Sequence, residues 1–363
     1  MKSLLRLLLK THHQRNRSES AQTEKGMTLV ELLVGAIMAF LILTPMLGFV
    51  VDMLNTDRRE QVKSNTEQDI QAAVDFIAQD LSQAIYIYDN RALNGPPGPN
   101  EQRVIPQLPQ NANETPILVF WKRQQLRNSL PINPTVAAGV KPTNCTPAEC
   151  NDTYVLSLVA YYQVRDNNPT WCQPAGANCP SRIVRYEIRD GIDRVIDPSV
   201  PGGATRYGKG NTTTAQRTDP AFNTNFNLNN PTVDVTTGPT GLTDKDSGAR
   251  NPEVLVNYID HSTQNVPIPT GADCQRLLSF VPPAVTPTGR PAFNPDHLLI
   301  TDRTTSTHSF YACVDTSKNI ARVTIRGNSL RRFQPKNTDY NVAKSAYFPT
   351  ASVQVQGLGA RGK

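Results

Sequence analysis

The chain has 363 residues, of which 38% are hydrophobic and 19% are charged, and its formal net charge at pH 7 is +6. This length allows a membrane segment together with one or two globular domains. The net charge does not indicate a nucleic-acid partner, because residues 1–25 carry six basic and two acidic side chains and so contribute +4 of the total. A basic N-terminus of this kind follows the positive-inside rule instead, which predicts that this end lies in the cytoplasm.

An apolar segment follows the basic N-terminus. Residues 27–51 contain a single charged side chain, Glu31, among 25 residues. As a helix, this segment is long enough to cross the hydrocarbon core of a bilayer, which is about 30 Å thick. A carboxylate in such a segment is energetically expensive and therefore marks a candidate functional site. The sequence thus predicts a transmembrane helix over residues 27–51, with Glu31 near its start.

The residues around Glu31 form a specific motif. Gly26 is followed by Met27-Thr-Leu-Val-Glu31 and then by the apolar segment, which resembles the N-terminus of type IV prepilins and pseudopilins. The resemblance implies that residues 1–26 are a leader that a prepilin peptidase removes after Gly26, and that the same enzyme methylates the amine of Met27. It also implies that Glu31 faces the N-terminal amine of a neighbouring subunit during filament assembly. Many members of the family have phenylalanine where this chain has Met27.

A secretory signal peptide and a plain membrane anchor are the alternative interpretations of this segment. A signal peptide ends in a small-residue cleavage site of the Ala-x-Ala kind, whereas residues 47–52 read Leu-Gly-Phe-Val-Val-Asp. A plain anchor has no need for a glutamate five residues after a glycine. Both observations favour the prepilin interpretation.

Residues 52–92 predict an amphipathic second half of the same helix. Apolar side chains recur there at spacings of three and four residues, while acidic side chains, including Asp80, take other faces. We therefore expect one helix from residue 27 to about residue 90, with a kink or a locally unwound turn near Pro45. Its apolar stripe should pack on a sheet, and the stripe comprises Ile70, Val74, Ile77, Leu81, Ala84, Ile85 and Tyr88.

Residues 93–363 predict a β-rich globular domain. Runs of β-branched and aromatic residues predict six strands, of which 154–165 and 182–189 should form a pair. Between about 197 and 252 the chain is polar and rich in Pro, Gly, Thr and Asn, which indicates a flexible surface insertion. The predicted fold is α+β, with a long N-terminal helix packed on an antiparallel sheet and with long polar insertions. The six predicted strands are 117–122, 154–165, 182–189, 309–315, 320–326 and 351–356.

The six cysteines all lie in this domain. An even number of cysteines in an exported domain favours disulfides, although their connectivity does not follow from spacing alone. A zinc site is the alternative, but the spacing lacks Cys-x-x-Cys and nearby histidines, so we expect no metal. We expect neighbouring cysteines to pair, as Cys145–Cys150, Cys172–Cys179 and Cys274–Cys313.

Three further features carry weaker signals. Residues 203–210 approach a nucleotide-binding P-loop, but the residue that should bind Mg²⁺ is Gly210. Asp166 and its neighbours could donate oxygens to Ca²⁺, without a complete loop pattern. Four basic residues near the C-terminus could contact an anionic glycan or an acidic partner, or could belong to a half-exposed edge strand. They are Arg322, Arg326, Arg331 and Arg332.

Two longer stretches of sequence resemble particular subgroups of the type IV pilin and pseudopilin family. Residues 68–84 are similar to the corresponding helix of J-type minor pseudopilins and W-type minor pilins, and residues 320–332 resemble cyanobacterial pseudopilins of hormogonium polysaccharide secretion. The resemblance implies a minor subunit at the filament tip that primes assembly and serves secretion or motility. The expected location is the inner (plasma) membrane, crossed once with the leader in the cytoplasm and the C-terminal domain outside, and then the filament.

The expected partners follow from the same resemblance. They are other pilins or pseudopilins, the prepilin peptidase, the inner-membrane assembly platform, membrane lipid before assembly, and an exported polysaccharide. A separate cytoplasmic motor hydrolyses ATP in this family, so we expect this chain to be no enzyme and to need no cofactor. The alternative function is a membrane-anchored extracytoplasmic binding module that does not polymerise, which needs neither leader cleavage nor a buried glutamate.

Overall fold

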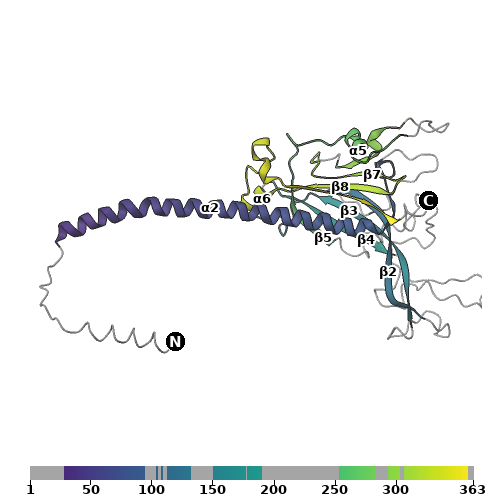
Figure 1. Cartoon of the computed structure of the whole chain (residues 1–363), viewed down its shortest axis with the longest axis horizontal. Helices are drawn as coiled ribbons and strands as arrows, with labels where there is room; N and C mark the ends of the chain where they lie inside the picture. Colours follow the sequence, from purple (N-terminus) through teal and green to yellow (C-terminus); the bar gives the residue numbers. More distant parts are fainter. Residues whose placement is uncertain are drawn as a thin grey trace, which may run out of the picture. The chain divides into compact units, whose positions relative to one another are not determined.

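The computed structural model describes residues 28–94, 104, 108, 113–131, 150–176, 178–189, 253–282, 293–302 and 306–358. These residues form an α+β structure with one long N-terminal helix and two antiparallel β-sheets (Figure 1). The chain divides into two compact units, residues 1–58 and residues 59–363. The coarse fold class agrees with the sequence prediction, whereas the single expected sheet is in fact two sheets.

The long helix α2 (Leu29–Ser82) begins immediately after Thr28. Its 54 residues continue through Pro45, so the unwound turn expected near this proline is absent from the described helix. Proline removes only one backbone donor, and in the adjoining turn the hydroxyl of Thr44 donates to the carbonyl of Phe40 at 2.8 Å. The apolar and amphipathic halves are therefore parts of one continuous helix.

The helix ends at Ser82, so the expected continuation to about residue 90, and with it a helical half reaching residue 92, is wrong. Residues Ala84–Ile87 form strand β1, which pairs antiparallel with β2 (Glu114–Pro131). Isoleucine and tyrosine dominate this stretch and favour a strand. Pairing with β2 also supplies the backbone hydrogen bonds that a longer helix would have made. A short helix, α3 (Asn90–Asn94), follows.

The first sheet has the strand order β1-β2-β3-β4-β5, with antiparallel pairing throughout. In it β3 (Cys150–Val164) pairs with β4 (Ser181–Arg189), which confirms the strand pair expected from the sequence. An additional strand, β5 (Glu253–Ile259), completes the sheet. It follows the polar stretch 197–252, which lies outside the described residues.

The second sheet has the order β6-β7-β8-β9 and is also antiparallel. The last three of its strands agree with predicted strands to within one residue. Two short helices lie in the same part of the chain, α5 (Gly271–Leu277) and α6 (Ser329–Phe333). The strands of the sheet are β6 (Leu299–Thr301), β7 (Phe310–Asp315), β8 (Ile320–Arg326) and β9 (Thr350–Gln356).

One hydrophobic core connects the second half of α2 with both sheets. Ile70, Val74, Ile77 and Leu81 of the predicted stripe are buried in it, and each such side chain contributes roughly 1.5–3 kcal/mol on burial. The approach is close, because a Cβ on Gly327 would lie 2.1 Å from Cδ1 of Ile70. The helix therefore packs as expected over the part that the sheets cover.

Candidate functional site

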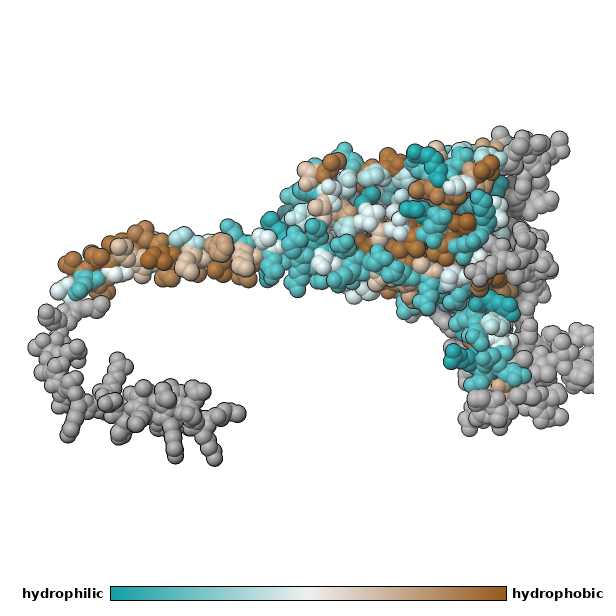
Figure 2. Space-filling model, viewed as in Figure 1, coloured by the Kyte–Doolittle hydropathy of each residue, from teal (hydrophilic) through white to brown (hydrophobic). Residues whose placement is uncertain are grey.

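The first half of α2 presents an uninterrupted apolar surface. Every side chain from Leu29 to Leu54 is exposed, and Figure 2 shows this part of the helix as a largely brown segment. Within the described residues, α2 is the one helix that is long and apolar enough to cross a membrane. An exposed apolar surface of this extent marks a contact with lipid or with other proteins.

Glu31 lies in the first turn of this helix. Its backbone N–H donates to the hydroxyl oxygen of Thr28 at 3.3 Å, and the same hydroxyl donates to Oε2 of Glu31 at 3.4 Å. A carboxylate at this end also interacts favourably with the helix dipole. Gly26 and Met27 lie outside the described residues, so leader cleavage and methylation remain predictions for those two positions.

Thr28 is a site residue that the sequence interpretation missed, although its signal was present. Thr28 and Glu31 are spaced as a Thr-x-x-Glu capping box, the pattern that begins many helices. Glu31 thus has a local role in starting α2. Its carboxylate is exposed and takes part in none of the ion pairs among the described residues, which leaves it able to meet a cationic group of another molecule.

A buried charge network holds the second half of α2 to the first sheet. Asp80, expected on another face than the apolar stripe, is instead buried, and its carboxylate accepts from Nζ of Lys122 at 2.8 Å and from Nε of Arg185 at 2.7 Å. The hydroxyl of Tyr161 donates to it at 2.7 Å. Glu187 completes the network at 2.7 Å from Arg185 and 3.7 Å from Lys122, so two carboxylates balance two cations.

The network shifts the pKa values of Asp80 and Tyr161. Burial alone would raise the pKa of Asp80, but the hydrogen bond from Arg185 and the charges of Lys122 and Arg185 outweigh it, so the pKa is lowered. Burial and then the charge of Asp80 raise the pKa of Tyr161 well above its usual value, so its hydroxyl remains a donor. Such a network positions the helix on the sheet.

Two of the expected disulfides are present, Cys172–Cys179 and Cys274–Cys313. Cys150 is also disulfide-bonded, but Cys145 lies outside the described residues, so the third pairing remains a prediction. Within the part of the chain that the structure describes, there is no free cysteine. The two observed bonds close loops of different size, because their cysteines are 7 and 39 positions apart.

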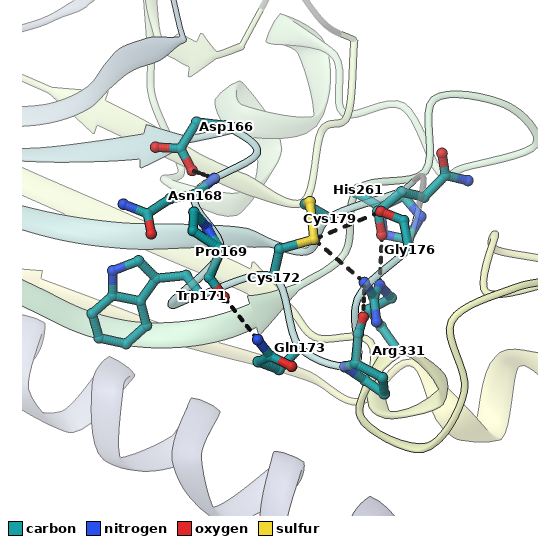
Figure 3. Close-up of a disulfide and its surroundings, with 12 residues drawn as sticks. Asp166, Asn168, Pro169, Trp171, Cys172, Gln173, Gly176, Cys179, His261 and Arg331 are labelled. Carbon is teal, nitrogen blue, oxygen red and sulfur yellow. Dashed lines mark hydrogen bonds between the residues drawn. A yellow bond between two sulfur atoms is a disulfide. The ribbon is translucent and has the colours of Figure 1, made fainter.

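The guanidinium of Arg331 fills the loop that Cys172–Cys179 closes (Figure 3). It is completely buried and donates to the carbonyl oxygens of Asn178 at 2.5 Å and Pro174 at 2.6 Å. A further contact at 3.5 Å joins it to Sγ of Cys172. Arg331 is therefore a structural support of this loop, because its donors satisfy carbonyl groups that would otherwise lack partners.

The other basic residues near the C-terminus also have partners within the chain. Arg326 is buried and contacts Oδ2 of Asp260 at 2.9 Å, while Arg332 pairs with Asp69 of α2. Arg322 donates to the hydroxyl of Ser352 at 3.0 Å. The interpretation as a ligand surface is therefore wrong for Arg331, which is completely buried, whereas Arg326 also lines a cavity.

Asp166, considered for Ca²⁺, instead binds an arginine. Its two carboxylate oxygens accept from Arg182 at 2.5 and 2.7 Å. The hydrogen bond from Arg182 lowers the pKa of Asp166 further than partial burial raises it. The described residues contain no group of His, Cys, Asp and Glu side chains arranged to hold a metal ion. Residues 203–210 lie outside the described residues.

A cavity of about 730 Å³ lies against the second sheet. The residues that line it combine aromatic rings with polar groups. One of them is His308, whose pKa is lowered by burial and by the charge of Arg326, so its imidazole is neutral at pH 7. Ile268 and Leu277 contribute exposed apolar side chains. Mixed linings of this kind suit small organic ligands. The principal lining side chains are His308, Tyr311, Thr324, Arg326, Tyr340 and Phe348.

Comparison of the chain with protein-family models, with curated proteins and with solved structures finds no match. The functional interpretation therefore rests on the residues of this chain.

Proposed function

We propose that this chain is a minor subunit of a type IV pilus or of a type II secretion-like filament. The observation that carries the proposal is the motif from Gly26 to Glu31 directly before an exposed apolar helix. The segment can lie in lipid before assembly and among the apolar helices of other subunits afterwards. One face of the second half of the same helix is buried against the sheets, so a force on the apolar half reaches the globular part through continuous helical backbone.

In this proposal, the peptidase acts at one end of the Gly26–Glu31 motif, and the filament contact is made by Glu31 at the other end. Cleavage after Gly26 creates a new amine on Met27, which methylation leaves positively charged. The carboxylate of Glu31 in the neighbouring subunit then pairs with this amine. Each charge alone is costly in an apolar environment, whereas a close pair recovers much of that cost. Unpaired subunits are thereby disfavoured inside the filament.

The narrower assignment concerns the place of the subunit. We place it at the filament tip, as a J-type or W-type subunit that primes assembly for secretion, including polysaccharide secretion, or for motility. Its partners are the other pilins or pseudopilins, the prepilin peptidase, the assembly platform, and the exported polysaccharide. The globular part then lies outside the plasma membrane, where its disulfides are stable.

The first experiment measures the N-terminal mass of the protein recovered from membranes, with and without the prepilin peptidase. The expected result is a chain that starts at N-methylated Met27, and that keeps its leader when the peptidase is deleted. An intact Met1 start in both strains would refute the filament proposal.

A second experiment separates the charge of Glu31 from its role in capping the helix. Glu31→Gln keeps a hydrogen-bonding side chain at the first turn and removes the charge, whereas Thr28→Val removes the capping hydroxyl and keeps the charge. We expect Glu31→Gln to reduce co-purification with other filament subunits at least tenfold, and Thr28→Val to preserve most of it. Equal losses in the two variants would mean that helix capping explains the effect.

The alternative function is a membrane-anchored binding module that does not polymerise. The cavity against the second sheet favours it, because a cavity of about 730 Å³ lined by rings and polar groups can hold a small ligand. This function predicts an uncleaved N-terminus and an unaffected Glu31→Gln variant, so the same two experiments distinguish it from the filament subunit.

A further inference from the structure

A second cavity, of about 270 Å³, lies where α6 and the residues after it meet α2. Figure 1 shows α6 beside this part of the long helix. The helix contributes Arg59 and Val62 to the lining, and residues 329–347 contribute the rest. The guanidinium of Arg59 lies 6.0 Å from the centre of the Phe333 ring. The cavity therefore belongs entirely to the unit formed by residues 59–363.

Arg59 extends the buried face of α2 toward the N-terminus of the helix. Positions 59, 62, 66 and 70 follow one another at spacings of three and four residues, so their side chains share one face. Thr66 and Ile70 on this face are buried, and Val62 is half-buried. At Arg59 the same face carries a charge, and this charge borders a cavity instead of packed side chains.

Two cations line the cavity, and none of its lining residues is acidic. Arg59 comes from α2, and Lys344 comes from the short helix η3 (Val342–Tyr347). Nζ of Lys344 donates to the carbonyl of Asn337 at 3.2 Å, which leaves two of its three donors. Among the described residues, neither cation takes part in an ion pair. Like charges around one cavity attract an anion, which relieves their mutual repulsion.

The remaining lining gives the cavity an apolar side. Val62, Leu330, Phe333 and Tyr347 contribute aliphatic and aromatic groups next to the two cations. The volume is slightly below the range of about 300–1,000 Å³ that is usual for sites of drug-sized molecules. It suits a smaller group, such as a phosphate with the glycerol carbons attached to it. A charged side and an apolar side together match an amphipathic ligand.

A membrane offers such a group close to this position in the chain. The apolar segment of α2 ends at Val51 and is followed by Asp52. Arg59 comes seven positions after Asp52, which is roughly 10 Å along a helix. The polar headgroup region extends roughly 5–8 Å beyond the hydrocarbon core on each side. Long side chains on a helix lean toward its N-terminus, which here is the direction of the apolar segment, so the Arg59 guanidinium can reach lipid phosphates.

We propose that this cavity binds the phosphate of an anionic phospholipid, with Arg59 and Lys344 as its two cationic contacts. A guanidinium can donate to two phosphate oxygens at once, and a lysine adds a compact positive charge. The contact would hold the globular part at the bilayer surface. This inference requires only that the apolar half of α2 lies in a membrane. It therefore applies to a filament subunit before assembly and equally to an anchored module, whatever the N-terminal mass shows.

Native mass spectrometry of the full-length protein in neutral detergent measures lipid binding directly. Phosphatidylglycerol should bind with one lipid per chain, and phosphatidylcholine at least fivefold more weakly, because its choline cation would meet two further cations. The double variant Arg59→Gln with Lys344→Gln should weaken phosphatidylglycerol binding at least tenfold. The matched control is Arg58→Gln with Lys336→Gln, which removes the same charge at neighbouring positions that do not line the cavity. It should change the affinity less than twofold.

The unfolding temperature of each variant without lipid shows whether the fold is intact. If the double variant is less stable, Arg59→Gln alone, at an exposed side chain, gives the same comparison with Arg58→Gln.

Three results would overturn the proposal. Equal weakening in the two double variants would mean that binding depends on net charge and not on the cavity. Equal affinities for phosphatidylglycerol and phosphatidylcholine would mean that the site does not select an anionic lipid. Glycerol 3-phosphate that binds as tightly as phosphatidylglycerol would identify a site for soluble phosphate esters instead.

Discussion

Replacement of Asp80 by alanine tests whether charge, as well as apolar packing, holds α2 on the first sheet. The Asp80 carboxylate accepts three hydrogen bonds of 2.7–2.8 Å. Without it, Lys122 and Arg185 would share only the carboxylate of Glu187, so one positive charge would remain uncompensated. The four charged side chains are at most 12% exposed, and water therefore cannot easily replace the missing partner.

The expected effect is large. Removal of one partner from a buried ion pair destabilises a protein by about 3–5 kcal/mol, against a typical total stability of about 5–15 kcal/mol. For a unit of this size, such a loss lowers the unfolding temperature by about 6–20 °C. The double variant Asp80→Leu with Lys122→Met removes one charge of each sign and leaves Arg185 paired with Glu187. It should recover at least half of the lost stability.

The assay is thermal unfolding of the full-length protein in detergent, followed by the fluorescence of Trp121 in a background in which the second tryptophan, Trp171, is replaced by phenylalanine. The Trp121 side chain is fully buried and adjoins Lys122 in the sequence, so it reports on the same region. The matched control is Asp75→Ala, an exposed aspartate of the same helix whose carboxylate accepts from the neighbouring Gln71 at 3.0 Å. The control should change the free energy of unfolding by no more than about 0.5 kcal/mol.

Two results would refute this reasoning. An Asp80→Ala variant within about 1 kcal/mol of the wild type would mean that solvent compensates the remaining cation. A double variant no more stable than Asp80→Ala would mean that the loss comes from disturbed packing and not from the unbalanced charge.

Three further predictions concern the same domain. The pKa of Asp80 is lower in the folded protein than its ordinary value of 3.8. The Asp80 carboxylate therefore stabilises the fold fully above pH 3.8, and this stabilisation disappears as the pH falls through the pKa of the folded protein. The unfolding temperature of the wild type should drop in acid more than that of Asp80→Asn. Arg331→Ala leaves two loop carbonyls without donors, which should cost about 2 kcal/mol or more and speed hydrogen exchange in residues 172–179. Replacing Cys274 and Cys313 by alanine opens a loop of 39 positions and should lower the free energy of unfolding by about 4 kcal/mol, against about 2 kcal/mol for the shorter disulfide, as measured by denaturant titration.

The spacing of apolar residues and the runs of β-branched residues correctly predicted much of α2 and several strands. The apolar stripe of α2 at Ile70, Val74, Ile77 and Leu81 is buried because its spacing matches one face of a helix. Strands β7, β8 and β9 follow from their β-branched residues. The end of α2 was misplaced because residues 84–88 satisfy the helical spacing and also have strong β-propensity. Pairing with β2 decides between the two, and it involves residues more than 30 positions away.

Some features of the candidate site could likewise be predicted from the sequence, and others could not. The motif around Glu31 and the capping pattern with Thr28 lie within six residues, so both can be read from the sequence. The burial of Asp80 could not be predicted, because an aspartate is acceptable in a core only when cations such as Lys122 and Arg185 arrive from other strands. The buried position of Arg331 depends in turn on a disulfide loop more than 150 positions earlier in the chain.

The sequence by itself determined the apolar segment, the motif that begins it, and the α+β class. These features depend on residue type, spacing and periodicity over short distances. Only the tertiary structure decided which charges are buried and paired, which cysteines form the two observed disulfides, where α2 gives way to β1, and that the described strands form two sheets. Most of these outcomes depend on contacts between segments far apart in the chain, and the free energy of such a contact is set by the partner as much as by the residue itself.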